Sequence, residues 1–190
     1  MLTADQVSAC LVTRGDQPDQ LARIIATLPY DEVIVWDNSV RPNYRTAGRF
    51  MAAIEARHDV VYFQDDDTLF THHHELMAAY EPGTITAVYG HGDNDGGYGD
   101  LPLVCGGALA DRQAVLDAFT QVEHTIEGLA YADFTVGVLT PFKHVDLPFE
   151  INMAIAQHPS RLCNQPWAYD AKARVTARAR AIRDGRAVAA

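Results

Sequence analysis

Hydrophobic residues follow two patterns along the first third of the chain, one typical of buried strands and one typical of amphipathic helices. Continuous apolar runs predict strands at Val7 to Thr13, Val33 to Trp36 and Val60 to Phe63. Apolar positions three and four residues apart predict helices over residues 17–28 and 43–57. The buried face of the second helix is expected to carry Ala47, Phe50, Met51 and Ile54. This βαβαβ order implies a parallel sheet with right-handed crossovers.

The remaining sequence continues the alternation of helices and strands. Further strands are expected at residues 85–89 and 103–109, and further helices at 71–80, after a capping Asp111, and at 172–186. The glycine-rich residues 90–100 predict a polar loop. A chain of 190 residues is long enough for one sizeable core. We therefore predict a single α/β, Rossmann-like domain in which helices flank a mostly parallel central sheet.

Charge is distributed unevenly along the chain. The net charge is −10, yet residues 171–190 hold six basic residues against one acidic residue, a net charge of +5. The remainder therefore carries −15, which disfavours general binding to nucleic acid because phosphate contacts dominate that affinity. Residues 171–190 are expected to form a basic helix or tail. One alternative is that this segment docks on the acidic body or ends as a frayed, solvated helix. The other is that it binds an anionic partner, a membrane surface or a nucleic acid.

The sequence carries no sign of a membrane segment or of secretion. No apolar stretch is long enough to cross a bilayer, and the N-terminus lacks the basic and apolar regions of a signal peptide. The three cysteines have no C-x-x-C spacing, so neither a disulfide framework nor a zinc ribbon is indicated. We expect a cytoplasmic protein.

Three consecutive aspartates, Asp65, Asp66 and Asp67, directly follow the third predicted strand. In an open parallel sheet, ligands bind beyond the carboxyl ends of the strands. The three carboxylates repel one another there, so an opposing charge is required. A hard divalent cation such as Mg²⁺ or Mn²⁺ fits, because it prefers oxygen ligands and shares them with phosphates. The pattern predicts metal-assisted chemistry on a phosphate-bearing substrate.

Polar residues also follow the first two predicted strands, as Thr13-Arg14 and Asp37-Asn38. If the three strands are parallel, these residues share one edge of the sheet with the three aspartates. A cleft there is expected to hold a nucleotide, with Asp37 accepting a hydrogen bond from the base and Thr13 or Arg14 reaching base, ribose or phosphate. The alternative is that these are ordinary polar turn residues.

This arrangement resembles the donor half of GT-A glycosyltransferases, most closely the family 2 and exostosin-like groups. The resemblance is carried by Trp36-Asp37-Asn38-Ser39, by Arg45, Gly48 and Arg49, and by Phe63-Gln64-Asp65-Asp66-Asp67. Asp65-x-Asp67 matches the DxD motif of this family, and it follows two βα units at the expected distance. The resemblance implies a GT-A domain over residues 1–170, with a donor half at about 1–100 and an acceptor half at about 101–170.

The resemblance implies a donor-binding or metal-binding role for several residues. Asp65 would face the donor ribose and the metal, Asp67 would bind the cation directly, and Asp66 would lie between them with fewer constraints. Asp37, with Asn38 beside it, would contact the base. Arg49 would lie near the base or the diphosphate.

Three residues of the second half are also implied by the resemblance. Gly107 would let the backbone approach the donor sugar or the acceptor. Asp133 falls where family members carry an acidic pair that supplies the catalytic base, although Ala132 replaces the first acid here. His158 would be a third metal ligand. The three histidines at 72–74 are instead expected at the solvated start of a helix, because adjacent helical residues point to different faces.

The resemblance implies transfer of a sugar from a nucleotide-diphosphate sugar, with UDP as the expected carrier and Mn²⁺ or Mg²⁺ as cofactor. The small size and the basic tail of this protein are similar to those of phage enzymes that glycosylate 5-hydroxymethylcytosine in DNA. A phage enzyme of this kind would act in the host cytoplasm. A cell-envelope glycan or lipid is the competing acceptor. A sugar-phosphate nucleotidyltransferase and a noncatalytic metal-binding or nucleotide-binding module are the alternative functions. The single glycine of Thr13-Arg14-Gly15-Asp16 disfavours the nucleotidyltransferase.

Overall fold

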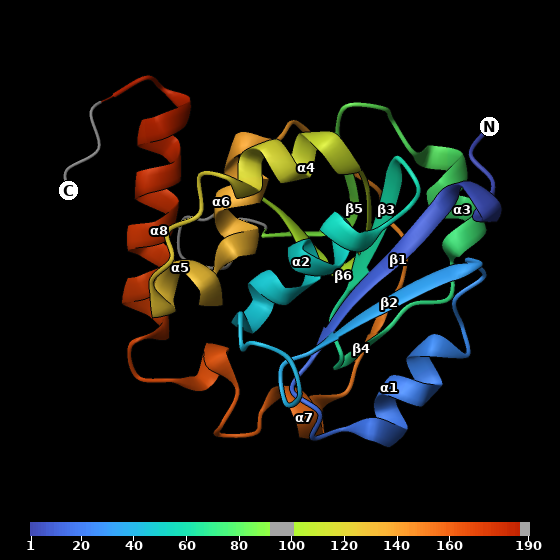
Figure 1. Cartoon of the computed structure of the whole chain (residues 1–190), viewed down its shortest axis with the longest axis horizontal. Helices are drawn as coiled ribbons and strands as arrows, with labels where there is room; N and C mark the ends of the chain where they lie inside the picture. The colour runs from blue at the N-terminus through green and yellow to red at the C-terminus, as the bar shows by residue number, and fades with distance from the viewer. Residues whose placement is uncertain (92–100, 187–190) are drawn as a thin grey trace.

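Three parallel strands form one side of a six-stranded sheet in the computed structural model (Figure 1). The strands, in sheet order, are β2 (Glu32–Asp37), β1 (Val7–Thr13), β3 (Val60–Gln64), β6 (Leu101–Asp111), β5 (Ile85–His91) and β7 (Phe142–His144). Only β6 runs antiparallel to its neighbours. The structure describes residues 1–91 and 101–186, so nearly all of the predicted loop at 90–100 lies outside the described residues. The predicted α/β class with a mostly parallel sheet is confirmed.

Helices cover both faces of this sheet. On one face lie α2 (Gly48–Glu55), α4 (Arg112–Phe119) and α6 (Ala132–Leu139), and on the other lies α3 (His73–Ala79). The remaining helices are α1 (Pro18–Ile25), α5 (Ile126–Ala130), α7 (Met153–Ala156), α8 (Ala168–Arg183) and the short 3₁₀ turns η1 (Ala4–Gln6), η2 (Arg45–Ala47) and η3 (Leu162–Asn164). None of the helices within the described ranges could span a membrane.

The second predicted helix differs from its expected form. It is divided into η2 and α2, and Ile54 on its expected buried face is 53% exposed. Arg49 is buried instead, with 1% exposure. Gly48 packs so closely on the sheet that a Cβ atom there would lie 2.6 Å from the Trp36 ring. The next residue, Arg49, reaches the end of β3, where its ion pair with Asp65 offsets its burial.

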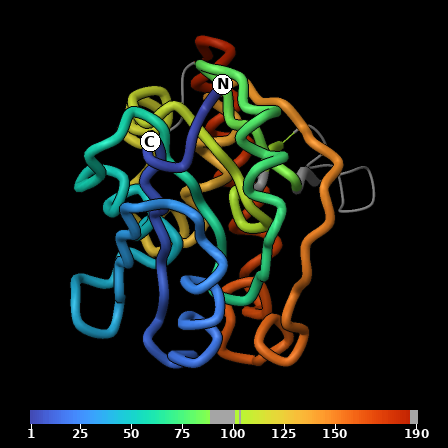
Figure 2. The backbone as a smooth tube through the Cα atoms, turned by 90° about the vertical axis from the view of Figure 1, so that its right-hand side faces the viewer, coloured from blue at the N-terminus to red at the C-terminus, as the bar shows by residue number. Residues whose placement is uncertain are grey.

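The chain after the sheet returns to the carboxyl ends of the first strands, as Figure 2 shows for residues 145–160. A short antiparallel pair, β4 (Thr68–Leu69) with β8 (Glu150–Ile151), fixes this return. The amide N–H of Asn152 also donates to the carbonyl oxygen of Asp67 at 2.7 Å. The C-terminal part of the domain therefore lies directly beside the three aspartates.

Helix α8 docks on the domain through both apolar and charged contacts. Ala171, Val175 and Ala179 are buried against α6. On its polar side, Arg174 pairs with Glu127 at 2.6 Å, and Arg178 pairs with the carboxylate of Glu123 at 2.8 Å. The described part of the basic segment is thus a helix docked on the acidic body, as one of its two predicted alternatives stated.

The histidine run differs from its predicted solvated position at its central member. His73 is only 2% exposed, and its Nδ1 lies 3.2 Å from the hydroxyl of Tyr30, in an aromatic cluster with Tyr62 and Phe70. Burial lowers the pKa of His73 from its ordinary 6.5 to about 4. The native protein therefore holds this imidazole neutral under conditions in which an unfolded chain would protonate it.

We predict that the pKa of His73 makes the free energy of unfolding depend on pH. Between pH 6.5 and about 4 the unfolded state binds the extra proton, so stability falls as pH falls through this window. The His73→Gln variant should lose this component, which amounts to about 3 kcal/mol. Urea unfolding at several pH values measures the slope. The exposed His74→Gln variant is the control, and equal slopes in both variants would contradict the prediction.

Candidate functional site

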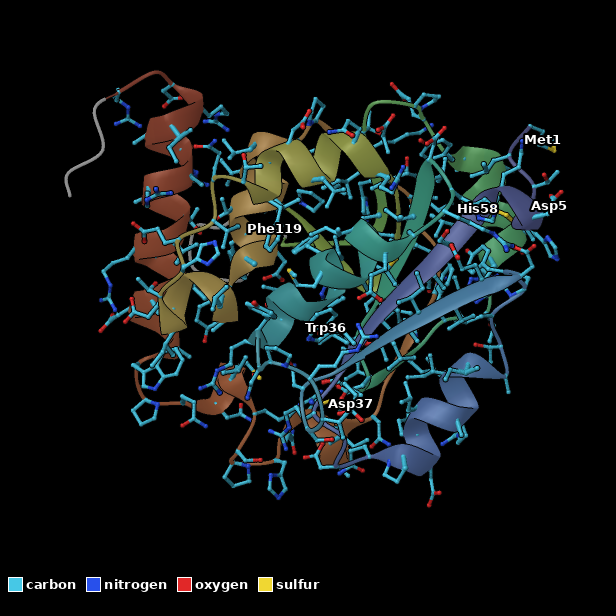
Figure 3. All side chains as sticks on the ribbon, in the orientation of Figure 1. Met1, Asp5, Trp36, Asp37, His58 and Phe119 are labelled. Carbon is cyan, nitrogen blue, oxygen red and sulfur yellow. The ribbon has the colours of Figure 1, made fainter. Side chains whose placement is uncertain are left out.

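A cavity of about 320 Å³ opens at the carboxyl ends of β1, β2 and β3. Figure 3 shows this end of the sheet at Asp37, opposite the end that carries Met1 and Asp5. Residues from six parts of the chain line the cavity: the ends of β1, β2 and β3, η2 with the start of α2, β6, the α5–α6 junction, residues 160–163 and α8. The sequence prediction of a cleft at this edge is therefore confirmed as geometry.

The cavity brings together most of the predicted site residues. These are Thr13, Arg14, Asn38, Arg49, Asp65, Asp66, Asp67 and Asp133. They come from both predicted halves of the domain, since Asp133 is in α6 and the others lie between β1 and β4. The residues predicted to bind the donor and the residue predicted to act as catalytic base thus line the same cavity.

Two buried arginines offset the charge of the three aspartates. Arg49 forms an ion pair with Asp65. Arg161, from the returning C-terminal segment, pairs with Asp66 at 2.8 Å and with Asp67 at 2.7 Å. Thr13 adds a hydrogen bond from its hydroxyl to Asp66 at 3.3 Å. The opposing charge that the sequence required is therefore supplied, within the described residues, by two guanidinium groups.

Burial and mutual repulsion shift the pKa values of this cluster. Burial raises the pKa of Asp67, the negative charge of Asp65 raises it further, and Arg161 partly offsets both effects. Burial by itself lowers the pKa of Arg161, but the charges of Asp66 and Asp67 outweigh burial and raise it. Asp65 and Asp67 therefore lie close enough to repel each other in spite of their arginine partners.

Asp133 forms a second, separate acidic position in the same cavity. It is 8% exposed, and its Oδ1 accepts no hydrogen bond from a described residue. Burial raises its pKa, and the charges of Arg49 and Lys172 act in the opposite direction. Arg49 Nε donates to the carbonyl oxygen of Thr46 at 3.2 Å, whereas its buried Nη1 has no partner among the described residues. Arg49 thus acts electrostatically on both Asp65 and Asp133.

Three predicted site residues do not line the cavity. Asp37 accepts hydrogen bonds from the amide and the hydroxyl of Ser39, at 2.8 and 2.6 Å, and stabilises its own turn. Gly107 adopts φ +120°, and a Cβ atom there would meet Phe70 at 3.1 Å, so the residue serves packing under α3. His158 is exposed, and its Nδ1 lies 2.7 Å from the hydroxyl oxygen of Ser160.

The returning segment closes one side of the cavity. Arg14 Nη1 donates to the carbonyl oxygen of Ser160 at 2.8 Å, and the Tyr131 hydroxyl donates to that of Leu162 at 3.1 Å. Arg161 lies between these two anchors and reaches inward to the aspartates. Residues 160–162 are therefore held over the strand ends by polar contacts on both sides.

Sequence reasoning missed Arg45, Arg161 and Lys172, which all line the cavity. Arg45 was quoted with the resemblance but given no site role, and Lys172 was counted only in the basic segment. Arg161 lies 95 residues beyond its partner Asp66 in the chain. One signal did exist, because three adjacent aspartates require a cation. From the sequence, a divalent metal ion was the expected source of this positive charge, and the arginines were not considered.

No group of three or more His, Cys, Asp or Glu side chains is placed to hold a metal ion in residues 1–91 and 101–186. The cavity does contain Asp65 and Asp67, two carboxylates that repel each other. Such a pair fits a cation that takes its remaining ligands from phosphate oxygens and water.

We predict that the Arg161–aspartate pairing stabilises the fold strongly. Arg161→Met leaves Asp66 and Asp67, both poorly exposed, without their cation. We expect a loss of about 3–5 kcal/mol, as for other broken buried pairs. Arg174→Met, which breaks an exposed pair, should lose less than about 1 kcal/mol. Equilibrium urea unfolding compares the two variants, and equal losses would contradict a buried role for Arg161.

The comparisons with protein families and curated proteins gave no match, so the proposed function rests on the geometry of the cavity. The chain matches no protein-family model, and no curated protein is detectably similar to it in sequence.

Proposed function

We propose that the chain is a metal-dependent glycosyltransferase. It would move a sugar from a nucleotide-diphosphate sugar, with UDP as the expected carrier, to an acceptor hydroxyl. One observation carries the proposal: the carboxylates that follow β3 and the buried Asp133 line the same cavity at the carboxyl ends of parallel strands. Ligands bind at this edge in open α/β sheets.

The donor side of the proposed site is the corner formed by Asp65 and Asp67. These carboxylates would hold Mn²⁺ or Mg²⁺, which supplies Lewis-acid stabilisation of the charge on a leaving diphosphate. Arg14 and Arg49 add positive charge to the same corner, and Thr13 and Asn38 offer hydrogen-bonding groups to the nucleotide. The predicted contact between Asp37 and the base stays a prediction.

The acceptor side of the proposed site is centred on Asp133. In the transfer, the acceptor oxygen forms a bond to the anomeric carbon while the bond from that carbon to the diphosphate oxygen breaks. The proton of the acceptor hydroxyl passes to Asp133, whose Oδ1 accepts no hydrogen bond from a described residue. Arg49 and Lys172 oppose the effect of burial on the pKa of Asp133 and so favour the ionised base.

The acceptor is proposed as a hydroxyl group, and the molecule that carries it is not assigned. The expectation of modified DNA depended on the basic C-terminal segment. Arg174 and Arg178, two of its six cations, are engaged with Glu127 and Glu123 of the same domain. A nucleic-acid footprint would need cations directed at phosphates.

We predict that the protein releases UDP from a UDP-sugar only when Mn²⁺ or Mg²⁺ is present. Asp67→Asn removes a proposed metal ligand and should lower this rate by about 10²-fold or more. In this variant Arg161 keeps its ion pair with Asp66, so the fold should remain intact. A panel of nucleotide sugars, assayed with Mn²⁺ and with EDTA, measures the release, and Asp19→Asn on the exposed face of α1 is the matched control.

Other outcomes of this experiment identify the alternatives. Formation of pyrophosphate from a nucleoside triphosphate and a sugar phosphate would show a nucleotidyltransferase. Nucleotide binding without turnover across donors and acceptors would show a binding module. Equal rates in EDTA and Mn²⁺ would contradict metal dependence.

A further inference from the structure

Two cations in the cavity form no ion pair with a carboxylate of the described residues. The chain contains 15 Lys and Arg residues, all within the described ranges. Those that form no ion pair with a described residue are Arg23, Arg45, Lys172 and Arg180, and the other eleven each pair with a carboxylate. Two of the four, Arg45 and Lys172, line the cavity. In a protein of net charge −10, acids are available to nearly every other cation.

Arg45 and Lys172 come from two different elements and line the cavity together with Tyr131. Lys172 Nζ, on α8, lies 5.7 Å from the ring centroids of both Tyr131 and Phe134. Arg45 belongs to η2, which packs on the end of α5, where the hydroxyl of Thr46 donates to the carbonyl oxygen of Ala130 at 3.0 Å. Ala130 directly precedes Tyr131, so η2 lies next to the backbone that carries this ring.

The backbone of Arg45 adopts a strained conformation. Its φ of +56° is the only positive value at a non-glycine residue within the described ranges. Asn38 Nδ2 donates to the carbonyl oxygen of Arg45 at 3.0 Å, and Asn43 Oδ1 accepts from its amide at 3.1 Å. Such conformations persist where the surroundings impose them, and they gather at ligand sites. The side chain is half-buried and has no hydrogen bond to a described residue.

We infer that Arg45 and Lys172 bind a compact anionic group of the substrate, a phosphate or a carboxylate. Half-buried cations in a concave, ring-lined wall have lost part of their hydration, so an anion that pairs with both is bound strongly. Lys172 acts electrostatically on Asp133 without an ion pair, which places the anion next to the proposed base. The assignment of this anionic group to the substrate rests on the proposed function, whereas the anion site itself does not.

Anion binding is tested without metal and without turnover. Calorimetry in EDTA at low ionic strength measures the affinity of the whole chain for inorganic phosphate and, separately, for glucuronate. Arg45→Asn keeps a residue that tolerates the left-handed conformation, and Lys172→Met keeps the packing on the rings. The double variant should bind the preferred anion at least tenfold more weakly than the original chain. Arg180→Met, which alters an unpaired cation of α8 outside the cavity lining, should change the affinity less than twofold.

Two results would overturn the inference: no binding of either anion by the original chain, or unchanged affinity in the double variant. Each single variant should show part of the loss, which guards against a double variant that folds poorly. If anion binding depends on both cations but no nucleotide sugar is turned over, the proposed function fails and the anion site stands.

The source of the anion is found by comparing UDP-glucuronate with UDP-glucose in the presence of Mn²⁺. A preference for UDP-glucuronate that disappears in Lys172→Met assigns the anionic group to the donor sugar. Equal affinity for both donors, with phosphate or glucuronate still bound beside them, assigns it to the acceptor.

Discussion

The pairing of three consecutive aspartates with two buried arginines is the constraint on which the site depends. Asp65, Asp66 and Asp67 follow β3, and Arg49 and Arg161 reach them from α2 and from the returning C-terminal segment. Without these cations the carboxylates would be buried uncompensated, a strongly unfavourable state. The same contacts hold residues 160–162 over the strand ends and so form one wall of the cavity.

The charge balance of the cavity explains what it can bind. Asp65, Asp66 and Asp67 are already paired, whereas Arg45 and Lys172 pair with no carboxylate of the described residues. Positive charge is therefore available for a ligand in the cavity of an acidic protein. A metal ion bound by Asp65 and Asp67 would compete with the guanidinium of Arg161 for the carboxylate of Asp67. Arg161 could then bind a ligand instead. Both routes favour an anionic substrate such as a nucleoside diphosphate. In the proposed transfer, Asp133 is the separate proton acceptor.

The residues at the edge of the sheet could be predicted from local sequence patterns. The long-range contacts between residues at this edge could not. Strand runs, helix periodicity and the Asp111 cap, whose carboxylate accepts from the Ala114 amide at 3.2 Å, are short-range signals and were predicted. The contact between Arg161 and Asp66 joins residues 95 positions apart and has no periodic signature. Arg49 was expected near a ligand, and its buried ion pair with Asp65 was not predicted. Gly107 was assigned to the cavity because glycine signals a close backbone approach, but the approach is to Phe70 on the opposite face.

A crystal structure of the complex with UDP and Mn²⁺ tests the central claim most directly. The account predicts Mn²⁺ bound by Asp65 and Asp67 together with diphosphate oxygens, and Arg161 moved from Asp67 towards the nucleotide. It further predicts that Asp133 faces the side of the cavity left open for the acceptor. Nucleotide bound outside this cavity, or Mn²⁺ held by other residues while Arg161 still pairs with Asp67, would contradict it.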